Sequence, residues 1–210
     1  MFITHLIDFL APADCLACGR EGSLLCKDCP LPAPRYGRCL FCHGPAPDAA
    51  IMCTCAPLEV VAAARHTGPA EQLVVALKYH GDKSAARLMA ARMAPLLPAQ
   101  GTLVPVPATL EHIRQRGFDQ AQLIARHLSR LSGLPYSPVL ARVGSHYQKG
   151  SDKATRHAAM TGALSVIHPV FGPAILIDDV LTTGATMTVA AEVLRQNGAT
   201  SVVGLAFSQA

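Results

Sequence analysis

The chain has 210 residues, half of them hydrophobic, and a formal net charge of +4. This length suits one medium domain plus a small one, because typical domains have about 100–150 residues. No apolar run approaches the ~20 residues of a membrane-spanning helix, so membrane insertion is not expected. The first ten residues lack a basic segment and are interrupted by Asp8, which argues against a signal peptide. We therefore expect a cytoplasmic protein, with residues 1–10 forming a short amphipathic helix.

The charge is unevenly distributed along the chain. Residues 1–60 hold four Lys/Arg against six Asp/Glu, whereas residues 61–210 hold fourteen against eight. A mildly basic C-terminal part fits a polyanionic ligand such as a pyrophosphate or a nucleic acid. The same imbalance is common in proteins that bind neither, so it only supports other observations.

All eight cysteines lie between residues 15 and 55, in closely spaced pairs: Cys15 and Cys18, Cys26 and Cys29, Cys39 and Cys42, and Cys53 and Cys55. A disulfide framework belongs in oxidising compartments, whereas Cys-x2-Cys pairs supply two thiolates of a tetrahedral zinc site. The tight spacing and the lack of an export signal favour structural Zn²⁺. A segment of about 50 residues with little apolar mass also needs metal ligation to fold.

Eight cysteines make two four-cysteine sites. Sequential pairing would join the first four into one site and the last four into another, and it closes the shorter loops. A cross-braced arrangement, in which the first pair joins the third and the second joins the fourth, remains an alternative. The narrow pair Cys53-Thr-Cys55 leaves the occupancy of the second site open, and His43 is either a spare ligand or a solvated bystander.

From about residue 60 the pattern alternates between strands and helices. The expected strands are 59–65, 102–106, 137–143, 173–177 and 201–207, and the expected helices are 71–79, 83–97, 119–131 and 186–196. Asp119 can cap the third of these helices and Gly133 can end it. Strands separated by helices predict an α/β fold with a parallel sheet covered on both faces. We place the domain boundary between residues 1–58, with the cysteines, and residues 59–210.

Residues 175–187 combine a buried strand, two acids, a Thr/Gly turn and the start of a helix. In open α/β sheets, ligands bind at the carboxyl ends of strands. The turn would present backbone N–H groups and hydroxyls at a helix N-terminus, which is an arrangement that binds phosphate. Asp178 and Asp179 fit a diol better than an anion, because carboxylates accept hydrogen bonds from hydroxyls. The segment therefore implies a ligand with both a phosphate and a ribose.

These 13 residues resemble the phosphoribosyl-pyrophosphate (PRPP) signature of type I phosphoribosyltransferases. The resemblance implies a type I phosphoribosyltransferase-like domain and Mg²⁺ bound with PRPP. It also implies that Asp178 and Asp179 contact the ribose hydroxyls. The residues implied to hold the 5′-phosphate are Thr182, Thr183, Gly184, Ala185 and Thr186.

Nearly the whole chain is similar to the competence protein F (ComF) family, which is linked to DNA uptake in transformable bacteria. The similarity rests on the cysteine module with its double zinc ribbon and on five further segments: Leu77–Asp82, Val104–Pro107, Arg114–Gln120, Gln148 with Arg156, and Gly162–Ala163. The family implies single-stranded DNA and the DNA-uptake machinery as partners. Asp119 stands where the family usually has Asn, and residues 159–164 lack its usual Asn and Arg.

Three further residues are candidates for PRPP binding. Lys78, beside a helix break, is either a pyrophosphate ligand or a solvated lysine. Val106 belongs to a segment that predicts a backbone-lined pyrophosphate loop with a non-trans peptide. For Arg114, phosphate contact and plain surface charge both remain open. The segment 147–153 is the candidate lid over the site, with Gly144 and Gly150 as hinges.

Three functions compete at this point. The first is a PRPP-binding protein that acts in the intracellular handling of DNA taken up during natural transformation. The second is a PRPP-dependent phosphoribosyltransferase acting on a nucleobase or another acceptor in nucleotide metabolism. The third is a zinc-bound scaffold with a vestigial transferase fold, which the intact loop at residues 175–187 disfavours. The sequence identifies neither a catalytic residue nor an acceptor, and the aromatic residues suited to base stacking are few and scattered along it.

Overall fold

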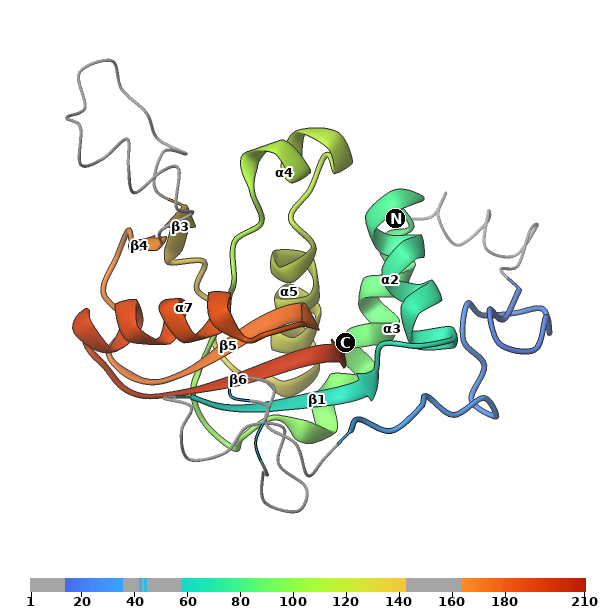
Figure 1. Ribbon diagram of the computed structural model, residues 1–210, viewed down its shortest axis with the longest axis horizontal. Coiled ribbons are helices and arrows are strands. Elements are labelled where there is room, and N and C mark those ends of the chain that lie inside the picture. The colour runs from blue at the N-terminus through green and yellow to red at the C-terminus, as the bar shows by residue number, and fades with distance from the viewer. Residues whose placement is uncertain (1–13, 36–41, 43, 45–57, 143–163) are drawn as a thin grey trace.

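The computed structural model describes residues 14–35, 42, 44, 58–142 and 164–210. Its main sheet is parallel, with the strand order β1-β6-β5-β2. These strands are β1 (Glu59–Arg65), β2 (Thr102–Pro105), β5 (Gly172–Leu181) and β6 (Ala199–Gln209). β5 pairs with both β2 and β6, which places it inside the sheet. Because every strand runs the same way, all four carboxyl ends meet at one edge (Figure 1).

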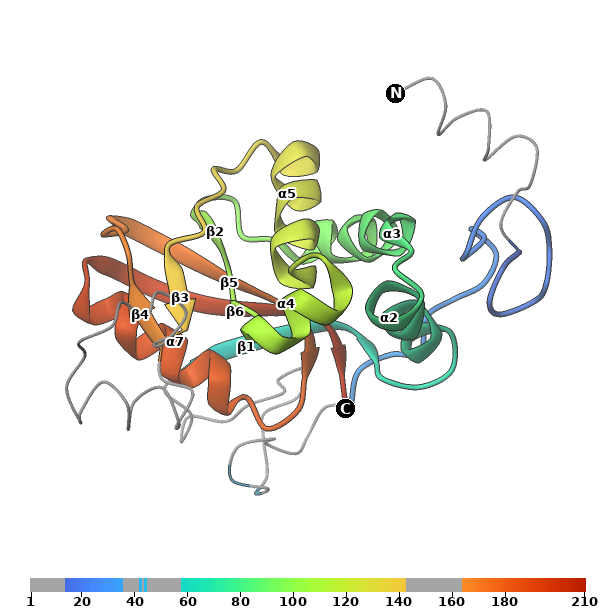
Figure 2. The ribbon, with the colours of Figure 1, turned by 90° about the horizontal axis from the view of Figure 1, so that it is seen from above.

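Helices cover both faces of this sheet, as Figure 2 shows. One face carries α2 (Pro69–Tyr79), α3 (Lys83–Met93) and α5 (Gln120–Ser132), and the other carries α7 (Ala185–Gln196). A 3-10 turn, η1 (Ala94–Leu96), follows α3, and the short helix α4 (Leu110–Arg116) stands clear of the sheet in Figure 1. A separate antiparallel pair consists of β3 (Leu140–Arg142) and β4 (Leu164–Val166).

Local sequence explains where several helices begin and end. Asp82 caps α3, since its carboxylate accepts a hydrogen bond from the backbone N–H of Ser84 at 2.9 Å. Asp119 caps α5 in the same way through the N–H of Gln122 at 3.0 Å. Gly133 ends α5 with a φ of 77°, in the left-handed region that favours glycine. These caps fix the start of two helices that lie side by side.

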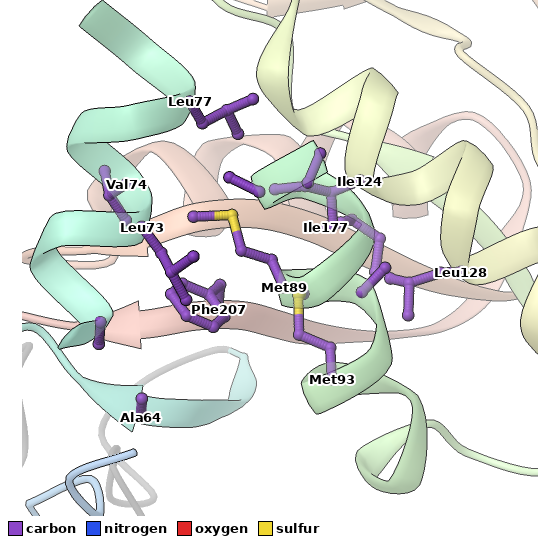
Figure 3. Close-up of a cluster of buried hydrophobic side chains, with 14 of the residues drawn as sticks. Ala64, Leu73, Val74, Leu77, Met89, Met93, Ile124, Leu128, Ile177 and Phe207 are labelled. Carbon is purple, nitrogen blue, oxygen red and sulfur yellow. The ribbon is translucent and has the colours of Figure 1, made fainter. Parts of the chain in front are cut away.

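The core between the sheet and α2, α3 and α5 is aliphatic and sulfur-rich. Figure 3 shows Leu77, Met89, Ile124 and Ile177 meeting there, and Phe207 of β6 is fully buried beneath them. A second cluster lies between the sheet and α7, around Leu176, Ala190 and Leu194. Two buried layers on opposite faces are typical of a parallel sheet, which has no solvated side.

The predicted α/β fold class with a parallel sheet is confirmed. The first strand has the predicted bounds, but β5 runs four residues beyond its predicted end at 177, so Asp178 and Asp179 lie within the strand. Helix α4 and strand β4 were not predicted from the sequence. The helix predicted at 83–97 is shorter in the structure, since α3 ends at Met93, before Pro95. The structure describes neither the helix expected at residues 1–10 nor the lid expected at 147–153. Within the described ranges, no helix combines the length and apolar character needed to span a lipid bilayer.

Candidate functional site

Asp178 and Asp179 lie beside the loop that follows β2. Pro105 of β2 pairs with Ile177 of β5, so both segments reach the carboxyl edge of the sheet together. After β2 the chain turns to α4 and α5, whereas after β5 it turns to α7 on the opposite face. A crevice forms where the chains leaving neighbouring strands separate in this way, and ligands of open α/β sheets bind there. The predicted acids therefore lie at the strand edge where a ligand is expected in a fold of this kind.

Asp179 is buried and paired with a lysine of α2. Its side chain is 4% exposed, and its Oδ2 lies 2.5 Å from Nζ of Lys78, whose side chain is 17% exposed. That oxygen has no hydrogen-bond partner of good geometry among the described residues, so the ion pair is its main compensation. The sequence left Lys78 open between a ligand and a solvated lysine, and the structure shows it half-buried against this acid.

Asp178 lies in an environment that favours its neutral form. Burial raises the pKa of Asp178 well above its ordinary value, and the neighbouring charge of Asp179 raises that pKa further. The backbone N–H of Asp179 donates to Asp178 Oδ1 at 2.8 Å, which opposes the shift without cancelling it. Asp178 is thus a carboxyl group that retains its proton at higher pH than usual.

The Thr/Gly turn after β5 presents an uncapped helix N-terminus. Thr182 and Thr183 are exposed, Gly184 has a φ of 75°, and α7 begins at Ala185. Thr183 Oγ1 accepts a hydrogen bond from the N–H of Ala185 at 3.3 Å, but no side chain caps the helix from the N-cap position. The helix was predicted to start at Thr186, and it starts one residue earlier, at Ala185. Free N–H groups and the helix dipole at this end suit an anion.

The loop after β2 is tied down by three hydrogen bonds. The N–H of Val106 donates to the carbonyl of Ile177 at 2.9 Å, and Arg142 Nε donates to the carbonyl of Pro107 at 2.9 Å. The N–H of Ala108 donates to Asp119 Oδ2 at 2.8 Å. No peptide bond among the described residues is cis, so the expectation of a non-trans peptide here is wrong. In this conformation Val106 has no free N–H for a pyrophosphate, and its contact with PRPP stays a prediction.

Asp119 has a structural role that the sequence reading only half anticipated. Besides capping α5, its second oxygen holds Ala108, so one buried carboxylate fastens the β2 loop to the start of a helix. Burial raises the pKa of Asp119, and its backbone N–H donors partly offset that rise. An Asn has only one carbonyl oxygen to accept both hydrogen bonds, which is a physical reason for Asp at this position.

Arg114 belongs to α4, the short helix that follows the β2 loop. It is exposed on α4, and the described residues include no ion-pair partner for it. Its neighbour Arg116 has its guanidinium carbon 5.7 Å from the ring centroid of Tyr79. The two readings of Arg114, phosphate contact and surface charge, both remain open.

Four cysteines of the N-terminal segment come together as a candidate metal centre. The Sγ atoms of the four all lie within 4.8 Å of one another: Cys15, Cys18, Cys26 and Cys29. In a tetrahedral site with Zn–S bonds of about 2.3 Å, sulfur atoms are about 3.8 Å apart, and the Sγ atoms of Cys18 and Cys26 are separated by 3.9 Å. The cluster can hold a metal such as zinc, and its membership agrees with sequential pairing for the first site.

The thiols of this cluster differ in acidity because of their neighbours. The backbone N–H of Cys26, 3.4 Å from Cys15 Sγ, is the main cause that lowers the pKa of Cys15 to about 6. Hydrogen bonding with Cys26 and Cys18 raises the pKa of Cys29 to about 12. Four sulfurs this close cannot all ionise without a cation among them, which is what a metal ion supplies. Cys42 is described, whereas Cys39, Cys53 and Cys55 lie outside the described residues, so the second site stays a prediction.

This segment is attached to the edge of the main sheet. The N–H of Arg65 in β1 donates to the carbonyl of Pro32 at 2.8 Å, and the N–H of Arg35 donates to Gln209 Oε1 at 2.7 Å. Leu25 is buried and belongs to the same apolar cluster as α2 and α3. The fold and the site together define an α/β protein with a parallel sheet and a small cysteine cluster at one sheet edge.

Comparisons with known proteins agree with the predicted resemblance, although no family model matches the chain. DNA utilization protein YhgH of Salmonella typhi is 29% identical over 90% of this chain and 85% of that protein. Competence protein F of Haemophilus influenzae is 34% identical over 46% of this chain and 44% of its own length, and competence protein ComFC of Bacillus subtilis is 37% identical over 46% and 39%. The chain is related to these proteins, and its predicted similarity to the competence protein F family is confirmed.

A solved structure of the allosteric regulatory enzyme of purine biosynthesis also aligns with the chain. The alignment covers 58% of this chain and 25% of the chain of that enzyme, with 21% sequence identity and a TM-score of 0.38. A similarity at this level supports no functional argument.

Proposed function

We propose that this protein binds PRPP together with Mg²⁺ at the crevice between β5 and β2, and that it acts in the intracellular handling of DNA taken up during natural transformation. The observation that carries the binding proposal is the placement of Asp178 and Asp179 near the end of β5, which leads through the Thr/Gly turn to the N-terminus of α7. The role in DNA handling is supported by the names of the relatives, which are a DNA utilization protein and two competence proteins.

In this proposal different groups of the protein contact the ribose and the phosphate of PRPP. Asp178 and Asp179 accept hydrogen bonds from the ribose hydroxyls, and the N–H groups and hydroxyls of 182–186 hold the 5′-phosphate. The donor set also fits Mg²⁺, because Asp179 Oδ2 is a carboxylate oxygen without a hydrogen bond. When bound, Mg²⁺ would neutralise charge on the pyrophosphate. Lys78 contacts the Asp179 carboxylate. Its ammonium group would therefore lie close to any ligand that replaced it as the partner of Asp179.

Calorimetric titration with PRPP and Mg²⁺ tests the binding proposal. The double variant Asp178→Asn/Asp179→Asn is expected to weaken binding by at least ~100-fold, because charge-assisted hydrogen bonds contribute about 1.5–3 kcal/mol each. Glu192→Gln, at an exposed acid of α7, is the matched control and should bind like the parent. Unchanged affinity in the double variant, with its fold intact, would remove these acids from the site. Adding nucleobases to a PRPP-binding protein and measuring pyrophosphate release then tests the alternative, a phosphoribosyltransferase.

The pH dependence of binding is a separate prediction. Because the pKa of Asp178 is raised in the free protein, this group keeps its proton to higher pH than usual, and a neutral carboxyl accepts a hydrogen bond from a ribose hydroxyl less strongly than a carboxylate does. PRPP affinity should therefore rise with pH above the ordinary carboxyl range and level off once Asp178 is ionised. Titrations across this pH range on the parent and on Asp178→Asn separate the effect from ionisation of the ligand's phosphates. A slope that is identical in both proteins would contradict the assignment.

A further inference from the structure

Within their helical residues, α3 and α5 carry positive charge and no negative charge, and the acids Asp82 and Asp119 cap their N-termini. Between Lys83 and Met93, and again between Gln120 and Ser132, there is no Asp or Glu. The two helices together contribute five cations: Lys83, Arg87, Arg92, Arg126 and Arg130. In the part of the chain that the structure describes, none of these five is in an ion pair. A layer of one sign without internal compensation is complementary to a polyanion.

Helices α3 and α5 pack against each other, and we name their basic surface, with Lys83, Arg87, His127 and Arg130, the α3–α5 seam. Lys83, Arg87 and Arg130 are exposed. Burial lowers the pKa of His127, and the positive charges of Arg130 and Arg87 lower that pKa further. Arg87 of α3 and Arg130 of α5 both act on this ring, and the two helices that carry them pack against each other.

Aromatic rings lie at the end of the seam that faces the candidate site. Nζ of Lys83 is 5.6 Å from the ring centroid of Phe118, and Arg116 is 5.7 Å from that of Tyr79. Tyr79 is 72% exposed and follows Lys78 directly in the chain. The sequence reading treated Tyr79 and Phe118 as scattered aromatics, but the fold places both beside cations next to the crevice. Rings paired with cations along a basic surface are the elements of single-stranded nucleic acid binding.

We propose that the α3–α5 seam, with the rings of Phe118 and Tyr79 at its end, binds single-stranded DNA. The exposed cations contact the phosphates, and the open ring face of Tyr79 stacks on an unpaired base, which a duplex does not offer. The seam is observed in the structure itself, whereas the choice of DNA as the polyanion rests on the proposed function. The strand would then run from the helix layer toward the PRPP crevice at Lys78.

Fluorescence anisotropy of the full-length protein with an oligothymidine of about 20 nucleotides, longer than typical site sizes, tests this surface. Arg87→Gln/Arg130→Gln removes two seam cations. It is expected to reduce the slope of log affinity against log salt by about 1.4, since each phosphate contact on a single strand contributes about 0.7. Lys27→Gln/Arg195→Gln removes the same charge from exposed positions outside the seam and serves as the control. Tyr79→Ala should lower affinity by about fivefold or more.

The outcomes separate this inference from the proposed PRPP site. Equal effects of the seam pair and the control pair would overturn the seam. Equal binding of a duplex of the same length, or equal competition by polyglutamate, would overturn single-stranded DNA as its occupant. Asp178→Asn/Asp179→Asn should leave DNA binding unchanged, so a protein that binds DNA at the seam but not PRPP would contradict only the proposed function. Loss of PRPP binding in the seam pair would show that its effect is not local.

Discussion

Removing the metal from the Cys15–Cys29 cluster is expected to unfold residues 14–35 while leaving the parallel sheet intact. The segment has few buried side chains of its own, mainly Cys15 and Leu25, and its remaining contacts are made at the sheet edge. Metal binding of structural zinc sites contributes about 10–16 kcal/mol in isolated peptides, which is more than such a segment can supply by burial. The core under α2, α3 and α5, by contrast, is formed mainly by helices and strands that start after residue 58, and Cys15 and Leu25 are the buried residues that the N-terminal segment adds to it.

Amide hydrogen exchange with and without a chelator measures this directly. Protection should be lost in residues 14–35 and kept in β5 and β6. Cys18→Ser is the informative variant, because Cys18 is exposed and its replacement removes a ligand without opening the core. It should lower the metal content by one ion per chain and reproduce the effect of the chelator, whereas Ser23→Ala should do neither. Full protection of this segment in metal-free protein would show that it folds without the ion, and loss of protection throughout the chain would contradict the division into residues 1–58 and 59–210.

The sequence predicted the sheet and its helices well because hydrophobic periodicity and caps are local signals. Asp119 and Gly133 mark the two ends of α5, and the structure shows both acting as predicted. The same reasoning placed Asp178 and Asp179 at a strand end, yet β5 continues through both. A strand extends as far as its neighbours pair with it, and β6 pairs with β5 up to Leu181, which is information that lies in distant residues.

The features that were missed depend on tertiary contacts. Helix α4 is short and has no buried residue, so its sequence has no apolar stripe to detect. The grouping of Tyr79 with Arg116, and of Phe118 with Lys83, joins segments that are far apart in the chain. The all-basic character of α3 and α5 was visible in the sequence, but its significance appears only once the two helices are seen to pack side by side.

Breaking the ion pair between Lys78 and Asp179 is expected to have a large effect on stability. Lys78→Met keeps the apolar stem of the lysine but leaves the Asp179 carboxylate buried without its cation. Removing one partner of a buried pair costs about 3–5 kcal/mol, and the lower end applies here because Lys78 is partly exposed. We therefore expect the free energy of unfolding, measured with urea, to fall by about 3 kcal/mol. Lys83→Met, on an exposed lysine of α3, should change it by less than ~0.5 kcal/mol.

The double variant Lys78→Met/Asp179→Asn decides whether the loss comes from the uncompensated charge. If it does, replacing the carboxylate by an amide should recover much of the stability that Lys78→Met loses, because the buried negative charge is gone. Additive losses would mean that Lys78 stabilises the fold through packing alone. The same cycle bears on the candidate site, because a ligand hydroxyl that donates a hydrogen bond to Asp179 must compete with Lys78 for that carboxylate. The pair therefore compensates the buried charge of Asp179, and a ligand that bound this acid would have to replace that compensation.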